Sequence, residues 1–415
     1  MATTSSTETG RLQINLTSSL GFEPVVEADI RIFSGSEPDQ QMEQVRTNIS
    51  GQTVQIPLPA PPLDYSMEPN GPQPFSNYNI EIRADGYRPV NVNGIEVLPG
   101  VTAVQPVSMA PDEISDNGPR DIEVPVNTLF GDYPPKMDEA EIKPIEESGE
   151  IVLSRVVIPE YVIVHDGPPS DRGARDYYVR YRDYIKNVAS SEIYATWPDA
   201  ALRANILAIM SFSLNRVFTE WYRNKGYNFT ITSSTAYDQK WSYGRNIFRN
   251  ISQIVDEMFN SFLARPNVRQ PILTQYCDGK NVTCPKWLSQ WGSKYLADQG
   301  YSTIEILRYY YGDNIYINTA EEIAGVPASW PGYDLQNGSS GSKVRQMQQQ
   351  LNVIARNYPA LPKIAEDGIF GPATEAAVSR FQSIFGLPST GVVNFATWYK
   401  ISQVYVGVSR IAELV

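Results

Sequence analysis

A single carboxylate stands in a stretch of this sequence whose residue types could do chemistry, "SEIYATWPDAALRANILAIM", from Ser191 to Met210. Glu192 lies close to Tyr194 and Trp197, a few residues ahead of a segment whose apolar spacing predicts a helix. Burial against aromatic rings disfavours the charged form of a carboxyl group and raises its pKa, whereas the start of a helix favours it. Because desolvation is the larger effect, Glu192 could act as a general acid once it is covered, although an acid that stabilises the start of the helix is the simpler interpretation of these residues alone.

Two further blocks carry aromatic and polar residues that could line a ligand-binding cleft. The first, "STAYDQKWSYG", offers Tyr237, Gln239 and Trp241, and the second, "WLSQWGSKY", offers Ser289, Gln290 and Trp291. Core packing or turn stabilisation is the competing interpretation for each of them. Asp238 and Asp199 could supply a second acid, although Asp199 is placed to stabilise the first turn of the predicted helix.

Histidine and cysteine usage limits the other kinds of chemistry. His165 is the one histidine, in "YVIVHDG" at a predicted strand end, so a site with several histidine ligands is excluded and a structural role is the simpler interpretation. Cys277 and Cys284, in "YCDGKNVTCP", could form a small loop disulfide or remain two buried thiols. A zinc site would need two more ligands, so we expect no metal and no cofactor.

Composition indicates a globular protein of several domains. The 415 residues, 42% of them hydrophobic, suffice for two to four domains, and no apolar run approaches the roughly 18 residues of a membrane helix. The net charge of −12 argues against nucleic acid as a partner. Most of this charge is local, since residues 111–150 hold twelve Asp and Glu against three Lys and Arg. The first residues, "MATTSSTETG", lack the features of a secretory signal, so the pattern leaves the export route open.

The residue patterns predict a multidomain α+β protein. Short alternating strands over residues 1–110 predict an antiparallel β-sandwich, and residues 111–150 predict an acidic, flexible linker that proteases could cut near its end. Residues 151–335 predict a mixed α/β domain, with helices over 198–224, 246–264 and 286–298 and Thr196 as the N-cap of the first. After the linker "LQNGSSGS", residues 336–415 predict a small helical module.

Three segments resemble known families. In the first region, "EIRADGYRPVNVNGIEVLPG" resembles the carboxypeptidase-regulatory-like, transthyretin-like modules. The last region contains "EDGIFGPAT" and "FQSIFGLPSTG" and strongly resembles the three-helix peptidoglycan-binding module. That resemblance implies a cell-wall ligand in a groove near the "EDGIFG" loop, with the candidate residues Asp367, Phe370 and Gln382. The middle region resembles the SpoIID family of sporulation proteins, which are lytic transglycosylases of peptidoglycan.

The SpoIID resemblance rests on three blocks in the same order. They are the Glu192 block with its Trp-Pro and Ala-rich helix, the Gln-aromatic-x-x-Gly block at "DQKWSYG", and the Ser-Gln-aromatic-Gly block at "SQWG" followed by "QGYS". The resemblance implies that Glu192 is catalytic. Relatives of this family usually carry a Cys/His cluster associated with zinc before Ser-Gln, whereas this chain has "TCPKW" there, which argues further against zinc.

The combination of these regions is similar to the SleC family of clostridial spore cortex-lytic enzymes. That similarity implies a zymogen, located in the cortex or coat region outside the spore core, which a subtilisin-like germination protease cuts to release a form that degrades cortex peptidoglycan. The first region would then be a prosegment that assists folding or masks the cleft, with docking to the spore coat as the alternative. Two rival functions stay open: a two-acid muramidase on the same fold, and a non-catalytic wall-binding scaffold.

Overall fold

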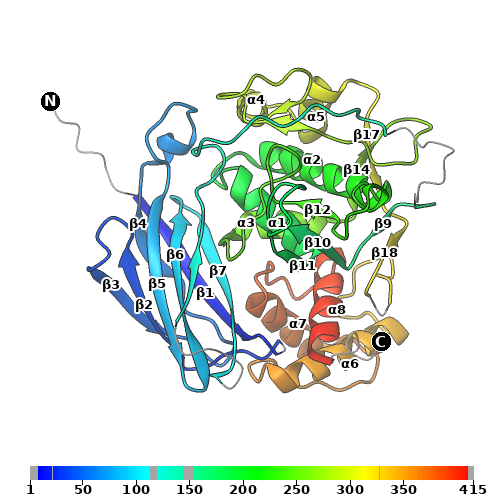
Figure 1. The fold of residues 1–415 in the computed structure, drawn as a ribbon. Helices are drawn as coiled ribbons and strands as arrows, with labels where there is room; N and C mark the ends of the chain where they lie inside the picture. Colours follow the sequence, from blue (N-terminus) through cyan, green and yellow to red (C-terminus); the bar gives the residue numbers. More distant parts are fainter. Residues whose placement is uncertain (1–7, 21, 113–118, 144–152, 327, 410–415) are drawn as a thin grey trace.

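The computed structural model describes residues 8–20, 22–112, 119–143, 153–326 and 328–409. Two β-sheets form the N-terminal part, helices and short strands form the middle, and three helices form the C-terminal module, which lies below the middle part in Figure 1. In the described residues, no helix is long and apolar enough to cross a membrane.

The N-terminal strands alternate buried and exposed residues, so each sheet buries one apolar face. One sheet has the strand order β13-β7-β1-β4 and the other β3-β2-β5-β6-β8. The prediction of purely antiparallel sheets is wrong, because β1 pairs with β7 and β6 pairs with β8 in parallel. The strands are β1 (Glu8–Ser18), β2 (Asp29–Ser34), β3 (Gln41–Arg46), β4 (Ile56–Ala60), β5 (Ser76–Ala84), β6 (Tyr87–Val97), β7 (Thr102–Met109) and β8 (Arg120–Glu123), with a short 3-10 helix η1 (Leu63–Ser66) after β4.

Strand β13 (Ile247–Phe248) belongs to the middle part of the chain but pairs with β7, so the N-terminal and middle parts share a sheet. A buried ion pair lies next to this junction, between Arg245 and Glu96 of β6. The backbone N–H of Glu96 also donates to the side chain of Asn246 at 3.2 Å. The N-terminal sheets are therefore fixed to the middle part by backbone pairing and by buried charge.

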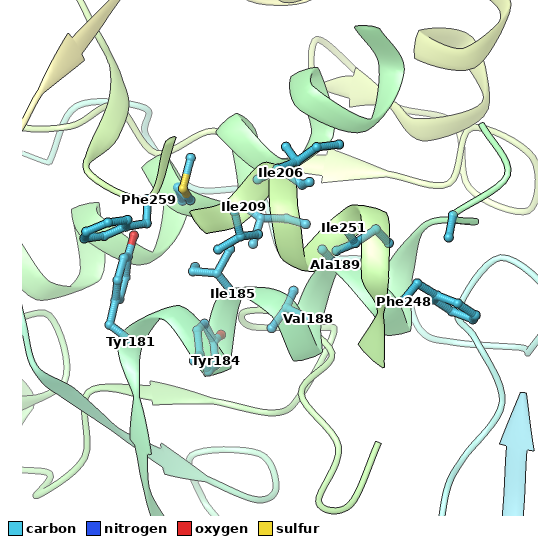
Figure 2. Packing of buried hydrophobic residues seen from close by; sticks show 14 of the residues in the cluster. Tyr181, Tyr184, Ile185, Val188, Ala189, Ile206, Ile209, Phe248, Ile251 and Phe259 are labelled. Carbon is cyan, nitrogen blue, oxygen red and sulfur yellow. The ribbon is translucent and has the colours of Figure 1, made fainter. Parts of the chain in front are cut away.

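In the middle part, helix α1 (Tyr181–Glu192) packs against α2 (Asp199–Phe218) and α3 (Arg249–Met258), as Figure 2 shows. Helix α2 is apolar on nearly all sides, and nearly all of it is buried. It ends at Phe218, six residues before the predicted end, and a 3-10 turn η3 (Arg223–Lys225) follows before Gly226, whose φ is +81°. Thr196 is not its N-cap, because the Thr196 hydroxyl donates to Ser66 instead.

Short strands divide the rest of the middle part. The predicted helix over 246–264 is split into β13, α3 and β14 (Ser261–Ala264), and the helix predicted from 286 begins at Gln290. The other elements are β9 (Val157–Ile158), β10 (Tyr161–His165), β11 (Asp176–Arg180), β12 (Ile231–Thr232), β15 (Tyr276–Cys277), β16 (Leu288–Ser289), α4 (Gln290–Asp298), α5 (Thr303–Tyr311), β17 (Tyr316–Thr319) and β18 (Glu322–Ile323).

Residues 124–143, which we call the strap, do not behave as the predicted flexible linker. The strap follows β8 and runs along the middle part of the chain, where its backbone and side chains make hydrogen bonds and ion pairs. Few large apolar residues are needed for this, because charged and backbone contacts fix the segment. The processing site expected beyond it lies largely in residues 144–152, outside the described residues.

The C-terminal module consists of α6 (Ser342–Asn357), α7 (Pro372–Ile384) and α8 (Phe395–Ser409). A buried glutamine fixes each of its two interhelical loops in the same way. Gln348 accepts a hydrogen bond from the backbone N–H of Gly368 and donates to Ile369, and Gln382 accepts from Gly391 and donates to Val392. The module also packs on the middle part, where Arg182 of α1 donates to the backbone oxygen of Tyr399 at 2.9 Å.

Two residue types singled out in the sequence have structural roles. The Nε2 atom of His165 donates to the backbone oxygen of Asp171 at 2.9 Å, and its Nδ1 lies 2.7 Å from a carboxyl oxygen of Asp176. The His165 ring stacks on Phe229. Cys277 and Cys284 form a disulfide, with their Cα atoms 5.7 Å apart. The disulfide closes the loop that follows β15.

Candidate active site

Glu192 is the last residue of α1, and 2% of it is exposed. The carbonyls at this helix end are satisfied from other elements: Arg245 donates to Ser190, the strap N–H of Thr128 donates to Ser191, and Gln290 donates to Glu192. These contacts hold the helix end and therefore the position of the carboxyl group. The sequence placed Glu192 near the start of α2, but the negative end of the α1 dipole is closer, and it disfavours the carboxylate.

The two carboxyl oxygens of Glu192 have different surroundings. Oε1 accepts a hydrogen bond from the backbone N–H of Lys240 at 2.6 Å. Oε2 is buried and makes no hydrogen bond of ordinary geometry among the described residues, and the same holds for the buried hydroxyl of Tyr276, which is close enough to influence the Glu192 carboxyl group. Leaving a buried carboxylate oxygen without a donor is costly, whereas a protonated Oε2 is free to donate. The geometry therefore favours a neutral acid with its proton on the unpartnered oxygen.

The electrostatics agree with this geometry. Burial raises the pKa of Glu192, and it outweighs the lowering by the Lys136 ammonium, by the Lys240 N–H and by the Tyr276 hydroxyl. Burial likewise raises the pKa of Tyr276 well above its usual value, and the charge of Glu192 adds to the effect. Burial lowers the pKa of Lys136, although Glu192 and Asp238 oppose this. The pKa of Glu192 is thus shifted in the direction that a general acid requires.

Glu192 lines a small cavity of about 60 Å³. One wall comes from the disulfide loop and its approach, including Tyr276 and Asp278, and another from Thr235 and Gln290. The third wall is the strap, which contributes residues from Thr128 to Lys136. Pockets for ligands of drug size usually have volumes of about 300–1,000 Å³, so this cavity is too small for a disaccharide while the strap is in place.

The aromatic residues expected beside Glu192 form a buried cluster and do not line this cavity. The rings of Tyr194, Trp197 and Trp291 lie 5.0–5.9 Å from one another, and each residue is at most 7% exposed. The Trp197 N–H donates to the backbone oxygen of Ser66 at 2.9 Å, which ties the cluster to the N-terminal part. In this conformation the cluster supports the segment after Glu192 from behind.

The other predicted site residues divide between the cavity and the scaffold. Gln290 lines the cavity with Glu192. Ser289 is the N-cap of α4 and accepts from the N–H of Gly292 at 3.0 Å, and Trp241 packs against Tyr177. Gln239 is fully buried, accepting from Tyr184 and Ser213 and donating to Ile209. Tyr237 lines a second, larger cavity of about 580 Å³.

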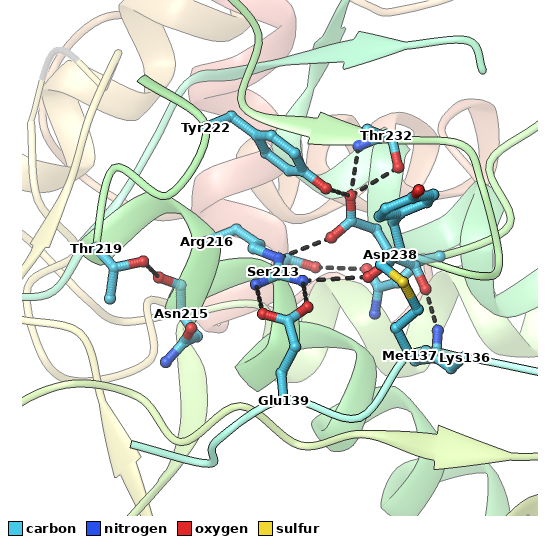
Figure 3. A network of polar contacts seen from close by, with 12 residues as sticks. Lys136, Met137, Glu139, Ser213, Asn215, Arg216, Thr219, Tyr222, Thr232 and Asp238 are labelled. Carbon is cyan, nitrogen blue, oxygen red and sulfur yellow. Dashed lines mark hydrogen bonds and ion pairs between the residues drawn. The ribbon is translucent and has the colours of Figure 1, made fainter. Parts of the chain in front are cut away.

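Neither of the predicted second acids lines the Glu192 cavity. Asp238 is fully buried, with one oxygen 2.7 Å from Nε of Arg216 and the other accepting from Tyr222 and Thr232 (Figure 3). Asp199 is exposed in the first turn of α2 and pairs with Arg203 at 2.7 Å. Asp278 does line the cavity, and its oxygens accept from backbone N–H groups of residues 280–282, which fold the disulfide loop.

Sequence reasoning missed the strap residues Tyr133 and Lys136 and the buried Tyr276. Nothing in an acidic, proline-rich stretch signals a contact with the cavity that is lined by Glu192, some fifty residues later. For Tyr276 a signal did exist, because it directly precedes Cys277 and a disulfide-closed loop holds its neighbours in place.

In the C-terminal module, Asp367 is exposed and accepts from the N–H of Ile369 and from Gln348. Phe370 and Gln382 are buried, so they form the core and the loop support. Of the three residues, Asp367 alone is placed to meet a ligand in this conformation.

Comparison with known proteins identifies the C-terminal module. Residues 340–401 match the family model described as a putative peptidoglycan binding domain. The chain carries a peptidoglycan-binding domain. It is 47% identical over 76 residues to the zinc D-Ala-D-Ala carboxypeptidase of Streptomyces albus G, across 18% of this chain and 28% of that protein. It is also 40% identical over 68 residues to a Kitasatospora aureofaciens protein described as "Uncharacterized protein in bpoA1 3'region", across 16% of this chain and 53% of that one.

The chain thus spans 28% and 53% of the lengths of these two curated relatives. A solved structure, the SleB N-terminal domain, is 28% identical and covers 19% of this chain and 99% of its own, with a TM-score of 0.17, at which it carries no argument about the fold. The peptidoglycan-binding domain supports peptidoglycan as a partner of this protein.

Proposed function

We propose that this protein is a peptidoglycan lytic transglycosylase of the spore cortex, of the SleC type, with Glu192 as its catalytic acid. The observation that carries the proposal is the buried Glu192 carboxyl group, which lines a cavity and whose Oε2 makes no hydrogen bond of ordinary geometry among the described residues. The peptidoglycan-binding domain brings the substrate class to the same chain.

One carboxyl group suffices for this reaction. Glu192 donates its proton to the glycosidic oxygen between muramic acid and glucosamine, and the bond from the muramic acid C1 to that oxygen breaks. The C6 hydroxyl of the same muramic acid then attacks C1 and gives its proton to the Glu192 carboxylate. A 1,6-anhydro ring forms, Glu192 is protonated again, and no water is consumed. Tyr276 and Gln290, which line the same cavity, are suited to position the sugar.

A two-acid muramidase is the second candidate, because Asp278 lines the cavity with Glu192. Three backbone N–H groups donate to the Asp278 carboxylate and hold it in a fixed position, as a base or nucleophile would require. The same contacts fold the disulfide loop, so a structural role explains them equally.

The decisive experiment digests purified cortex with the protease-activated chain and examines the fragments by mass spectrometry in water labelled with heavy oxygen. Transglycosylation gives products one water lighter than hydrolysis would, without label at the new end. Glu192→Gln should lower the rate at least about a hundredfold, the usual minimum for a general acid, while sacculus binding persists. Labelled reducing ends would establish the muramidase instead, and binding without any release would establish a scaffold.

The zymogen and its location in the spore, outside the core, are part of this proposal. Activation by a subtilisin-like germination protease would cut the chain between about residue 149 and Val156, beyond the strap. Comparing muropeptide release by the uncut and the cut chain tests this step. Equal rates would contradict it.

A further inference from the structure

Two cavities follow one another along the strap. Lys136 lines the Glu192 cavity, and the next residue, Met137, lines the cavity of about 580 Å³. The opposite wall shows the same succession, because Thr235 lines the first cavity and Tyr237 the second. The two cavities are therefore neighbours along both walls, and strap residues line both of them.

The strap is bound in an extended form, through alternate residues. The N–H of Met137 donates to Ala236 at 2.7 Å, and Gln275 donates to the carbonyl of Met137 and accepts from the N–H of Glu139. Further along, the carbonyl of Glu141 accepts from Leu273, and Lys143 pairs with the side chain of Gln270 in both directions. This is how a groove binds an extended peptide, with the backbone held at every second residue.

Charged side chains anchor the strap in addition. Glu139 makes two hydrogen bonds to Arg216, at 2.6 and 3.0 Å, and Figure 3 shows this pair beside the Arg216–Asp238 pair. Burial alone would raise the pKa of Glu139, but Arg216 and Lys143 outweigh it and hold it at about 2. Arg265 binds Glu141 in the same bidentate way, at 2.6 and 2.8 Å. The Glu139 side chain is 14% exposed and that of Glu141 33%, so Glu139 is the stronger anchor.

The larger cavity has the composition of a sugar-binding groove. Trp221, Tyr222, Tyr227 and Tyr237 line it, together with the strap residues 137–140 and 143. Aromatic rings offer apolar faces with polar edges, which suits the apolar faces and hydroxyl groups of sugar rings. Without the strap, this aromatic groove and the Glu192 cavity would be continuous.

We propose that the strap is an intramolecular inhibitor lying in the glycan-binding groove, so that the chain binds glycan across Glu192 and the aromatic groove only after the strap has left. This inference rests on the proposed function for the identity of the ligand. Lys136 would contribute to the inhibition in two ways. Its side chain fills space next to Glu192, and its ammonium group favours the ionised form of that acid.

The test uses the full-length chain with the strap loosened. Glu139→Gln removes the anchor to Arg216 but leaves Arg216 paired with Asp238, so the middle part keeps its buried ion pair. Glu141→Gln is a milder variant at the more exposed anchor. Asp132→Asn is the matched control, because Asp132 is an exposed strap acid and its loss changes the net charge equally.

The first measurement is the affinity for a soluble tetrasaccharide of alternating N-acetylglucosamine and N-acetylmuramic acid, by calorimetry, with Glu192→Gln in every protein to prevent turnover. The apparent affinity is reduced by the fraction of molecules with an open groove, so Glu139→Gln should tighten binding roughly tenfold. Glu141→Gln should tighten it less, and Asp132→Asn should match the parent chain.

The second measurement is muropeptide release by the same strap variants with Glu192 intact. Release should rise in the same order as affinity. If affinity rises and no variant releases product, the strap occupies a glycan groove and the proposed chemistry is wrong. If all variants bind the tetrasaccharide like the control, the inhibitor proposal is overturned, whether or not product is released. Thermal melting checks that each variant is folded. If Glu139→Gln does not fold, the affinity of Glu141→Gln decides the proposal.

Discussion

The effect of Glu192→Gln on stability, measured against the unaltered chain, should be more favourable at neutral pH than at acidic pH. The pKa of Glu192 is raised in the folded state by burial, so the folded chain holds this proton at pH values at which the unfolded chain, with a pKa of about 4.3, has lost it. The contribution of this proton to the free energy of unfolding is therefore fully present below about pH 4, and it is lost as the pH rises through the folded-state pKa. Glutamine is neutral throughout and escapes that loss.

The magnitude follows from the linkage relation. Each unit by which the folded-state pKa exceeds the unfolded one costs about 1.4 kcal/mol at pH values above both. Glutamine brings an opposing effect, because its N–H₂ group would replace Oε2, which makes no hydrogen bond of ordinary geometry among the described residues, and an unsatisfied buried donor costs about 1–3 kcal/mol. The cost of burying the glutamine donor is the same at every pH. Comparing the variant with the parent at two pH values therefore isolates the cost of ionising Glu192.

The assay is thermal unfolding of the unaltered chain and of Glu192→Gln at pH 4 and pH 7. At each pH we subtract the melting temperature of the parent from that of the variant. We expect this difference to be larger at pH 7 than at pH 4, by about 3 °C for each unit by which burial raises the pKa of Glu192. A relative melting temperature that falls over this range would refute the reasoning, because it would mean that Lys136 and the Lys240 N–H stabilise the carboxylate more than burial destabilises it.

Three further predictions concern other parts of the chain. Glu96→Gln should lower the free energy of unfolding by about 3–5 kcal/mol, because it leaves Arg245 buried without its partner, whereas the exposed Glu123→Gln should have little effect in the same denaturant titration. Reducing the Cys277–Cys284 disulfide should cost about 2.5 kcal/mol from loop entropy and slow muropeptide release, since this loop forms a wall of the Glu192 cavity. Gln348→Ala should weaken sacculus binding and destabilise the C-terminal module by about 1–3 kcal/mol, because the buried groups of the loop lose their partner, while Gln349→Ala on the exposed side should leave pull-down of sacculi unchanged.

The sequence predicted the parts of the fold that local patterns determine. Alternating strands, the buried helix near Pro198 and the glycine-punctuated loops of the last module are local features, and the structure has them. Residues 246–264 show where this fails, since their apolar spacing suits one helix, yet Ile247 and Phe248 pair with β7 and residues 261–264 pair with β17. Those partners are distant in sequence, so no local pattern reveals them.

The sequence placed some residues of the candidate site together, but it did not reveal the walls of the cavity. Glu192 and Gln290, which were expected to serve the same cleft, line one cavity, and their roles stay predictions. The aromatic residues near Glu192 in sequence pack into the core, because side chains a few positions away on a turn point in other directions. The strap was missed for a different reason: its low apolar content predicts a free chain, and its binding depends on arginines and glutamines of the middle part.

The sheet shared between β7 and β13 bears on what a single peptide-bond cleavage can accomplish. Severing the backbone past the strap leaves the ladder between these strands and the Arg245–Glu96 pair in place, so the two fragments would stay together as a non-covalent complex. The delay between proteolysis and full exposure of the groove would then be set by the rate at which the N-terminal fragment dissociates from the rest of the chain. The time between cleavage and activity would then depend on the strength of the shared interface and not on the rate of the protease.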